Sequence, residues 1–328
     1  MRRPHRTLYF KEPGMSLQLE RTLPLMFKAR AEKMPHIVAQ YAKDEKGVFQ
    51  PKTYAEMYEE ICEIASGLLE IGVQRGDHVG LISDNRQEWL VTDFAILSLG
   101  AADVPRGCDS TDAEIAYILS FSDCKVSFAE NQKQVEKILG KKEGIPLLTI
   151  IITYDRVSEE TVQAAQAKGV RLYHYSEIRS IGKERRKNKP GEIEAEMEKG
   201  QRDDLATIIY TSGTTGEPKG VMLSHGNFLH QLPTLPLIVD LRPGQVWLSV
   251  LPVWHSFERI MQYVAPCFNT AIAYSKPVGS IMLADFQAVR PHWMASVPRI
   301  WESVRDGIYR NIKQQGVLKS ISLTSLWP

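Results

Sequence analysis

Short apolar runs alternate with helix-like segments along the first half of this chain. The runs at residues 78–82, 101–104, 125–129 and 147–153 have the length and composition of buried strands. The segments between them carry apolar residues three and four positions apart, and some open with a capping box such as Thr53-x-x-Glu56. Strands that are apolar on both faces need helices on both sides of their sheet. The pattern therefore predicts an α/β fold of mostly parallel sheets covered by helices.

Further elements are predicted downstream of residue 204. Apolar segments at 206–209, 246–251 and 292–297 predict strands, and residues 285–289 predict the end of a helix. Another helix is predicted from residue 299, with one face formed by four apolar side chains at helical spacing: Trp301, Val304, Ile308 and Ile312.

Composition and charge exclude several classes of protein. The 328 residues carry a net charge of +1 with 24% charged residues, so no global field favours nucleic acid or an anionic membrane. No apolar stretch of the kind found in secretory signals follows the N-terminus, and the longest apolar run, residues 147–154, is too short to cross a bilayer. The four cysteines have neither metal nor disulfide spacing. A cytoplasmic location without a nucleic-acid partner is therefore predicted.

The sequence changes character between residues 182 and 204. A basic run at 183–189 is followed by glutamates at 192, 194, 196 and 198. A basic run of this length is able to contact nucleic acid or lipid head groups, but the adjacent acids cancel its field and no aromatic residues interleave for base stacking. We therefore predict a charged, solvent-exposed connector that divides the chain into segments 1–181 and 205–328.

A segment rich in glycine and hydroxyl groups directly follows the strand predicted at 206–209. It reads Tyr-Thr-Ser-Gly-Thr-Thr-Gly-Glu-Pro-Lys-Gly over residues 210–220. Glycines let successive N–H groups converge on an anion, hydroxyls add hydrogen bonds or a magnesium ligand, and lysine adds a positive charge. These properties predict a phosphate-binding loop, with an ordinary surface loop as the alternative. The spacing matches neither Gly-x-x-x-x-Gly-Lys-Ser/Thr nor Gly-x-Gly-x-x-Gly.

A second chemically notable segment, Leu-Pro-Val-Trp-His-Ser-Phe-Glu-Arg, occupies residues 251–259 after another predicted strand. Open parallel sheets bind ligands beyond the carboxyl ends of their strands, so this position favours a binding site. Trp254 and Phe257 flank His255, and Glu258-Arg259 is capable of forming an ion pair. From these residues alone, a histidine packed in the core is an equally good interpretation of His255. A metal site lacks further ligands at a recognisable spacing.

The loop and the histidine segment together resemble a known family. Thr-Ser-Gly-Thr-Thr-Gly-x-Pro-Lys-Gly is similar to the signature of the adenylate-forming superfamily, and the likeness continues through residues 221–227. Trp-His-Ser-Phe-Glu-Arg resembles the long-chain fatty acyl-CoA synthetase branch, as do residues 103–110 and 296–302. The resemblance extends from residue 22 to residue 313. Arg106 and Arg299 lie in the two shorter stretches and receive no catalytic role, because ion pairing in the interior would explain them equally well.

The resemblance implies a two-step reaction. A fatty carboxylate attacks the α-phosphorus of ATP to give acyl-AMP and pyrophosphate, and coenzyme A then displaces AMP. Lys219 and His255 are the implied catalytic residues, and Thr211 is the implied Mg²⁺ ligand. The implied nucleotide site comprises Thr211, Ser212, Gly213, Thr214, Thr215, Gly216 and Lys219. The implied acyl site comprises Trp254, His255, Ser256 and Phe257.

Several elements of the family are not found in this sequence: a Tyr-Gly-x-Thr-Glu segment, a Thr-Gly-Asp element and the small C-terminal domain with its lysine. We therefore expect the incomplete large N-terminal domain of such an enzyme, built of stacked sheets, with a first α/β subdomain in 1–181 and an incomplete second one in 205–328. The chain alone is expected to have little or no activity, with the missing portion encoded separately as one explanation. A nucleotide-binding remnant and an enzyme for another carboxylate are the alternatives. Peripheral membrane contact stays open, because long-chain fatty acids partition into bilayers.

Overall fold

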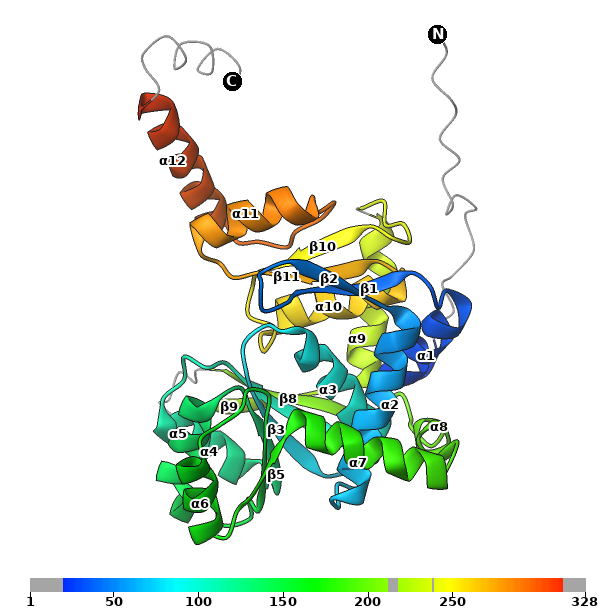
Figure 1. The fold of residues 1–328 in the computed structure, drawn as a ribbon. Helices are drawn as coiled ribbons and strands as arrows, with labels where there is room; N and C mark the ends of the chain where they lie inside the picture. The colour runs from blue at the N-terminus through cyan, green and yellow to red at the C-terminus, as the bar shows by residue number, and fades with distance from the viewer. Residues whose placement is uncertain (1–19, 212–217, 238, 315–328) are drawn as a thin grey trace.

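The computed structural model describes residues 20–211, 218–237 and 239–314, which form two β-sheets surrounded by helices (Figure 1). One sheet has seven strands in the order β7-β6-β5-β3-β4-β8-β9, and the other has four in the order β10-β11-β1-β2. Among the described strand pairs, β8–β9 and β1–β2 are antiparallel and the others are parallel. The predicted α/β fold with mostly parallel sheets is confirmed.

The seven-stranded sheet contains the four apolar runs predicted in the first half of the chain. Its strands are β3 (His78–Ile82), β4 (Ala102–Arg106), β5 (Val126–Ala129), β6 (Ile150–Thr153), β7 (Arg171–His174), β8 (Leu205–Thr211) and β9 (Lys219–Ser224). Helices α4 (Asp112–Phe121), α5 (Gln132–Gly140) and α6 (Glu159–Ala167) lie on one side of the sheet (Figure 1). The other side is covered by α2 (Tyr54–Glu70), α3 (Gln87–Ser98) and α7 (Tyr175–Asn188). The sheet therefore has an apolar cluster on each face.

Helix α2 begins at the predicted capping box. Glu56 N donates to Thr53 Oγ1 at 3.2 Å, and Thr53 N donates to Glu56 Oε2 at 2.7 Å. Helix α7 packs so closely on α2 that a Cβ at Gly182 would lie 1.7 Å from the Glu63 carbonyl oxygen. The contact between these two helices therefore requires glycine at position 182.

The segment 182–204 is helical over much of its length, because it contains the end of α7 and the short helix α8 (Glu192–Met197). Its basic run is balanced locally, since Arg185 pairs with Glu192 and Glu70 and Arg186 pairs with Glu59 and Glu194. Strands from both sides of this segment join both sheets. The domain boundaries at 181 and 204 stay a prediction.

The four-stranded sheet lies above the seven-stranded sheet in Figure 1 and combines β1 (Val38–Lys43), β2 (Phe49–Thr53), β10 (Val246–Ser249) and β11 (Ala271–Tyr274). Helix α10 (Ser256–Cys267) packs on its lower face, between the two sheets, and α11 (Gly279–Val289) lies on the other face. The short helix α9 (His225–Gln231), continued by the 3₁₀ helix Leu232–Leu237, and α1 (Leu23–Lys33) flank α10. Helix α10 thus stands between the sheets.

The predictions for the C-terminal part of the described chain were less accurate. Residues 292–297 form no regular strand, and only Trp293 makes a single bridge, to Trp247 of β10. Helix α12 (Pro298–Gln314) exists as predicted but projects away from the sheets (Figure 1), so Trp301 and Ile308 are 50% and 52% exposed. Within the described residues, no helix combines the length and apolar character that crossing a bilayer requires.

Candidate functional site

The predicted phosphate loop lies between β8 and β9, which pair as an antiparallel hairpin. The register pair nearest the loop is Thr211 with Lys219, and both side chains are exposed. A Cβ at Gly220 would lie 2.8 Å from Ile208 Cγ2, so the hairpin favours glycine there. Five predicted nucleotide-binding residues lie outside the described part of the chain: Ser212, Gly213, Thr214, Thr215 and Gly216. The hairpin presents a hydroxyl and an ammonium group at the base of the loop.

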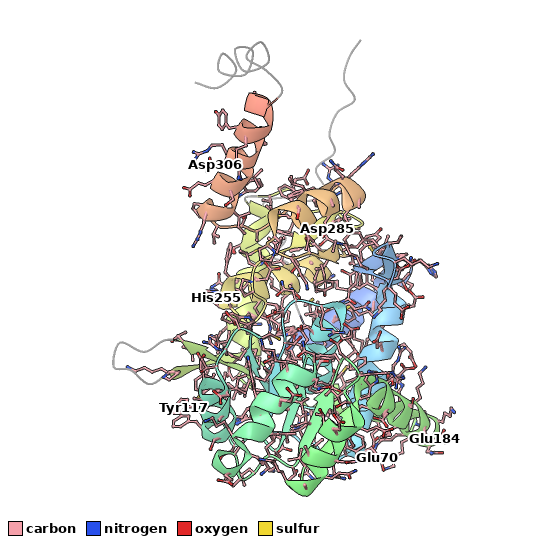
Figure 2. All side chains as sticks on the ribbon, turned by 60° about the vertical axis from the view of Figure 1, so that its left-hand side comes forward. Glu70, Tyr117, Glu184, His255, Asp285 and Asp306 are labelled. Carbon is pink, nitrogen blue, oxygen red and sulfur yellow. The ribbon has the colours of Figure 1, made fainter. Side chains whose placement is uncertain are left out.

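A cluster of aromatic side chains holds the hairpin against α4. The buried Tyr210 shares a hydrogen bond with the Ser122 hydroxyl at 2.7 Å and packs edge-to-face against Tyr117, with 6.3 Å between ring centroids. The Tyr117 hydroxyl donates to the carbonyl oxygen of Pro218 at 3.4 Å, and Tyr117 is labelled in Figure 2. The two ends of the loop are therefore fixed by the sheet and by α4.

Asn85 holds the turn that connects β10 to α10. Its amide nitrogen donates to the Leu251 carbonyl at 2.6 Å and to the Ser249 hydroxyl at 2.8 Å. Its amide oxygen accepts a hydrogen bond from Val253 N at 2.9 Å. One side chain from the loop after β3 therefore sets the path of residues 251–253.

His255 is the N-cap residue of α10, and its Nδ1 accepts from Phe257 N at 3.5 Å. The side chains of His255 and Phe257 are exposed and Ser256 is half-buried, so the core-histidine interpretation of His255 is wrong. Figure 2 shows His255 at the level between the two sheets. The turn and the first turn of α10 therefore present an imidazole and an aromatic ring to solvent.

Trp254 is turned toward the end of β4. The Arg106 guanidinium carbon lies 4.9 Å from the centroid of its ring, and a Cβ at Gly107 would lie 2.2 Å from Trp254 Nε1. Glycine at 107 therefore leaves the room that the indole occupies, and the guanidinium stacks on its face.

Arg106 links the two candidate segments. Besides stacking on Trp254, it donates to the Tyr210 carbonyl at 3.4 Å and to the Ser110 hydroxyl at 2.9 Å, and it pairs with Glu114. Sequence reasoning gave Arg106 no role, although its place at the carboxyl end of a predicted parallel strand was the available signal. The structure confirms an ion pair for Arg106, whereas Arg299 is exposed at the start of α12.

Glu258 and Arg259 do not pair with each other. The Arg259 side chain is fully buried and makes ion pairs with Asp93 at 2.6 Å and Asp103 at 2.9 Å. Glu258 faces β10 instead, and burial raises its pKa to about 8, an effect partly opposed by hydrogen bonds from Ser249 and Gln262. The two adjacent residues thus tie α10 to two different parts of the core.

One group of side chains within the described residues has metal-like spacing. Ligand atoms of Asp84, Cys108 and Glu130 lie within 4.8 Å of one another after β3, β4 and β5. Hydrogen bonds explain the grouping, because Asp84 accepts from Cys108 N at 3.1 Å and Glu130 accepts from Asp84 N at 2.8 Å. We therefore assign no metal to this group.

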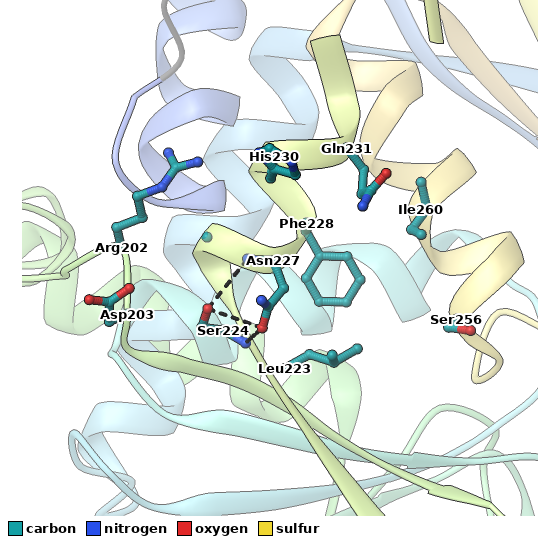
Figure 3. A pocket seen from close by; sticks show the side chains of 11 residues that line it. Arg202, Asp203, Leu223, Ser224, Asn227, Phe228, His230, Gln231, Ser256 and Ile260 are labelled. Carbon is teal, nitrogen blue, oxygen red and sulfur yellow. Dashed lines mark hydrogen bonds between the residues drawn. The ribbon is translucent and has the colours of Figure 1, made fainter. Parts of the chain in front are cut away.

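A cavity of about 570 Å³ opens between α9, α10 and β9 (Figure 3). Leu223, Phe228 and Ile260 give it an apolar wall, and Ser256 lies at its α10 end. Among the predicted acyl-binding residues, Ser256 lines this cavity, whereas Trp254, His255 and Phe257 do not. The predicted site is therefore divided between the cavity and the turn in front of α10.

Comparison with known proteins gives consistent relatives. The sequence matches the family model described as AMP-binding enzyme over residues 27–325. It is 33% identical over 268 residues to a chloroplastic long-chain-fatty-acid–[acyl-carrier-protein] ligase of Arabidopsis thaliana, covering 79% of this chain and 36% of that protein. It is 30% identical over 301 residues to a long-chain-fatty-acid–CoA ligase of Mycobacterium tuberculosis, covering 89% and 46%. The chain therefore spans less than half the length of these curated relatives.

A solved structure shares the fold. The A domain of a carboxylic acid reductase from Segniliparus rugosus, in complex with AMP and a co-purified carboxylic acid, superposes with a TM-score of 0.74 at 19% identity. The match covers 92% of this chain and 52% of the other. The two sheets and their helices thus correspond to part of a larger domain of the same architecture.

Proposed function

Because the chain belongs to the AMP-binding enzyme family, we propose that it supplies the phosphate loop and the histidine segment of a long-chain fatty acid–CoA ligase. The observation that carries the proposal is the position of Arg106. Its side chain contacts Tyr210 in the hairpin that closes the loop and Trp254 in the turn before His255. Tyr210 and Trp254, 44 positions apart in sequence, are therefore linked through one side chain, as a nucleotide and an acyl group in one reaction require.

The hairpin is the proposed phosphate side of this site. Lys219 offers an exposed ammonium group, and Thr211 beside it offers a hydroxyl of the kind that Mg²⁺ accepts as a ligand. Bound Mg²⁺ would neutralise phosphate charge, and Lys219 would add a second positive charge at the loop. Bringing a carboxylate to a polyphosphate joins two anions, so catalysis rests on positioning and charge neutralisation.

The turn before α10 is the proposed acyl side. His255 is exposed at the start of the helix, where an imidazole is able to hydrogen-bond to the reacting carboxyl group. Ser256 borders the cavity whose wall includes Phe228 and Ile260, which suits an apolar chain. Arg106 fixes Trp254 rather than touching either substrate, so we treat it as a positioning residue.

Binding of ATP with Mg²⁺ tests the phosphate side without requiring turnover. We expect Lys219→Ala to weaken binding in calorimetry by roughly tenfold to a hundredfold, the value of a charge-assisted hydrogen bond. Lys46→Ala, which removes another exposed lysine from the β1–β2 turn, serves as the matched control. Equal binding by Lys219→Ala and by the unchanged chain would contradict the proposed phosphate site.

Fatty-acid-dependent exchange between ATP and pyrophosphate tests the first half-reaction. Because the chain spans less than half of its curated relatives, we propose that it performs little exchange alone. Efficient exchange by the unchanged chain that is lost in Lys219→Ala would overturn the proposal that the chain alone is nearly inactive. It would also overturn the alternative that the chain is a non-enzymatic nucleotide-binding remnant. Exchange with an aryl or short-chain acid but none with palmitate would favour another carboxylate.

An acyl carrier protein is a second candidate acceptor for the acyl group. The name of the Arabidopsis relative favours it, since that protein is named as a ligase for the acyl carrier protein. Supplying pre-formed acyl-AMP with either thiol distinguishes the two. We propose coenzyme A, and transfer to the carrier alone would reverse this choice. A cytoplasmic location belongs to the same proposal.

A further inference from the structure

The inner face of β10 meets α10 through polar side chains. Trp247 and Ser249 lie two positions apart on β10, so both point to the same face, opposite Glu258 and Gln262 of α10. All four line one internal cavity of about 10 Å³, together with apolar residues that include Leu248 of β10 and Ile272 of β11. All four side chains are more than nine-tenths buried. The contact between helix and sheet therefore encloses a polar space.

Hydrogen bonds inside this space are incomplete. The Ser249 hydroxyl accepts from Asn85 at 2.8 Å and from Gln262 at 3.1 Å, which leaves its single hydrogen to be donated to Glu258. Three buried atoms have no hydrogen-bond partner: Trp247 Nε1, Glu258 Oε2 and Gln262 Oε1. Buried polar groups without partners destabilise the folded state, so three at residues that line one cavity point to a bound polar molecule.

The size of the cavity limits what it holds. A cavity needs about 10–15 Å³ to accept one water molecule, which in turn needs two to four polar partners. We propose that this cavity is an internal water site in which Glu258 is a neutral carboxylic acid, and that the site fixes the turn before His255 from behind. The water accepts hydrogen bonds from Trp247 and from the Glu258 hydroxyl, and it donates one to Gln262.

The charges around Glu258 are compatible with its neutral form. On α10 itself, the neighbouring Arg259 guanidinium is occupied by Asp93 of α3 and Asp103 of β4. On β11, Tyr274 is the titratable neighbour, and burial raises its pKa, with Glu258 adding to the effect. On β10, Ser249 is uncharged. No cation among the described groups acts on the Glu258 carboxyl, so burial raises its pKa to about 8.

The site connects directly to the turn. Ser249 is shared between the cavity and Asn85, and Asn85 in turn holds Leu251 and Val253. Glu258 is therefore a positioning residue for the segment that carries His255. This inference does not require the ligase proposal to be correct, because its tests measure protonation, water binding and stability.

The central test compares Glu258→Gln with the unchanged chain. The pKa of Glu258 is about 4.5 in the unfolded chain and about 8 in the folded one, so the folded state binds one more proton between these values. The unfolding equilibrium constant of the unchanged chain should therefore rise tenfold per pH unit across this window, on the order of a thousandfold in all, relative to Glu258→Gln. Glu302→Gln, an exposed change on α12, is the matched control and should keep the pH dependence.

Two further readouts are specific to the site. Burial also raises the pKa of Asp93, to about 7, so the infrared absorption of protonated carboxyl groups at pH 7 should be weaker in Glu258→Gln than in the unchanged chain and in Glu302→Gln, rather than absent. A high-resolution crystal structure should show one water bonded to Trp247 Nε1, and Glu258→Gln should retain it. The inference would be overturned if Glu258→Gln changed neither the infrared absorption nor the pH dependence, or if the crystal structure showed a dry cavity.

Discussion

Helices α9 and α10 lie side by side, and each has a histidine at its start, but the two histidines are in opposite environments. His225, the first residue of α9, is 1% exposed and accepts a hydrogen bond from Leu23 N at 3.4 Å. Burial lowers its pKa to about 4. His255, the N-cap of α10, is exposed. A histidine at a helix start is therefore structural in one case and open to a ligand in the other, and burial alone makes the difference.

The helix that carries the exposed histidine is also the one with the most demanding interior contacts. One turn after His255, Arg259 reaches Asp93 and Asp103 with no exposure to solvent, while α9 buries no charged pair of this kind among its described residues. We infer that α10 needs a rigid anchor because His255 and Phe257 at its start are exposed to solvent. Four changes test whether the anchor and the open end are separable.

Arg259→Met should cause the largest loss of stability. The substitution keeps most of the volume but leaves Asp93 and Asp103 buried without their cation, which costs about 3–5 kcal/mol when one partner of a buried pair is removed. Urea denaturation monitored by tryptophan fluorescence measures the free energy of unfolding.

Arg305→Met is the matched control for this change. Arg305 pairs with Asp306 at 3.0 Å on the exposed surface of α12, so its removal should change stability by less than about 0.5 kcal/mol. Equal effects of the two substitutions would show that the buried cluster does not anchor α10.

His225→Gln tests the buried histidine through pH. The unfolded chain binds a proton on this imidazole below about pH 6.5, whereas the folded chain does so only below about pH 4. The contribution of this imidazole to stability should therefore fall by up to about 3 kcal/mol as the pH drops from 6.5 to 4. Glu258 acts in the opposite sense above pH 4.5, so this fall is measured as the difference between the unchanged chain and His225→Gln. His36→Gln, at an exposed position, should leave the fall unchanged, and the opposite pattern would assign the pH dependence elsewhere.

The local part of the fold was predictable from sequence. The runs at 78–82 and 125–129 became strands because strand and helix signals are short-range, and the Thr53 capping box formed as expected. The prediction of a strand at 292–297 was wrong. An apolar pattern does not show whether a neighbouring strand is available to pair, and here the pairing is a single bridge at Trp293. The apolar face of α12 was recognised, but its exposure depends on what packs near Trp301, which periodicity does not specify.

The candidate site was predictable as two segments but not as one place. Lys219 and His255 could be named from composition and resemblance, since glycine, hydroxyl and imidazole groups carry recognisable chemistry. The link through Arg106 could not, because a guanidinium stacked on Trp254 depends on the packing of β4 against the turn. Glu258 and Arg259 are adjacent in sequence, which suggested an ion pair between them. Successive residues of a helix point in different directions, however. Arg259 instead pairs with Asp103, which is 156 positions away in sequence.

Asn85→Ala should have an intermediate effect, because it releases the turn without disturbing the buried charges. Three hydrogen bonds, to Ser249, Leu251 and Val253, are lost, and we expect a destabilisation of about 1–3 kcal/mol. Faster hydrogen exchange confined to residues 249–255 would show that the turn has been released. Faster exchange throughout α10 instead would mean that Asn85 supports the whole helix rather than the turn.

His255→Ala should have the smallest effect on stability and the most local effect on binding. Its cap hydrogen bond to Phe257 N is long, at 3.5 Å, so we expect a loss below about 1 kcal/mol. If His255 contacts the acyl phosphate, a non-hydrolysable acyl-AMP analogue should bind roughly tenfold more weakly. His230→Ala, an exposed histidine of α9 on the cavity wall, is the comparison. Weaker binding in His230→Ala but not in His255→Ala would place the ligand in the cavity, away from the turn. The exposure of His255 would then be unrelated to ligand binding.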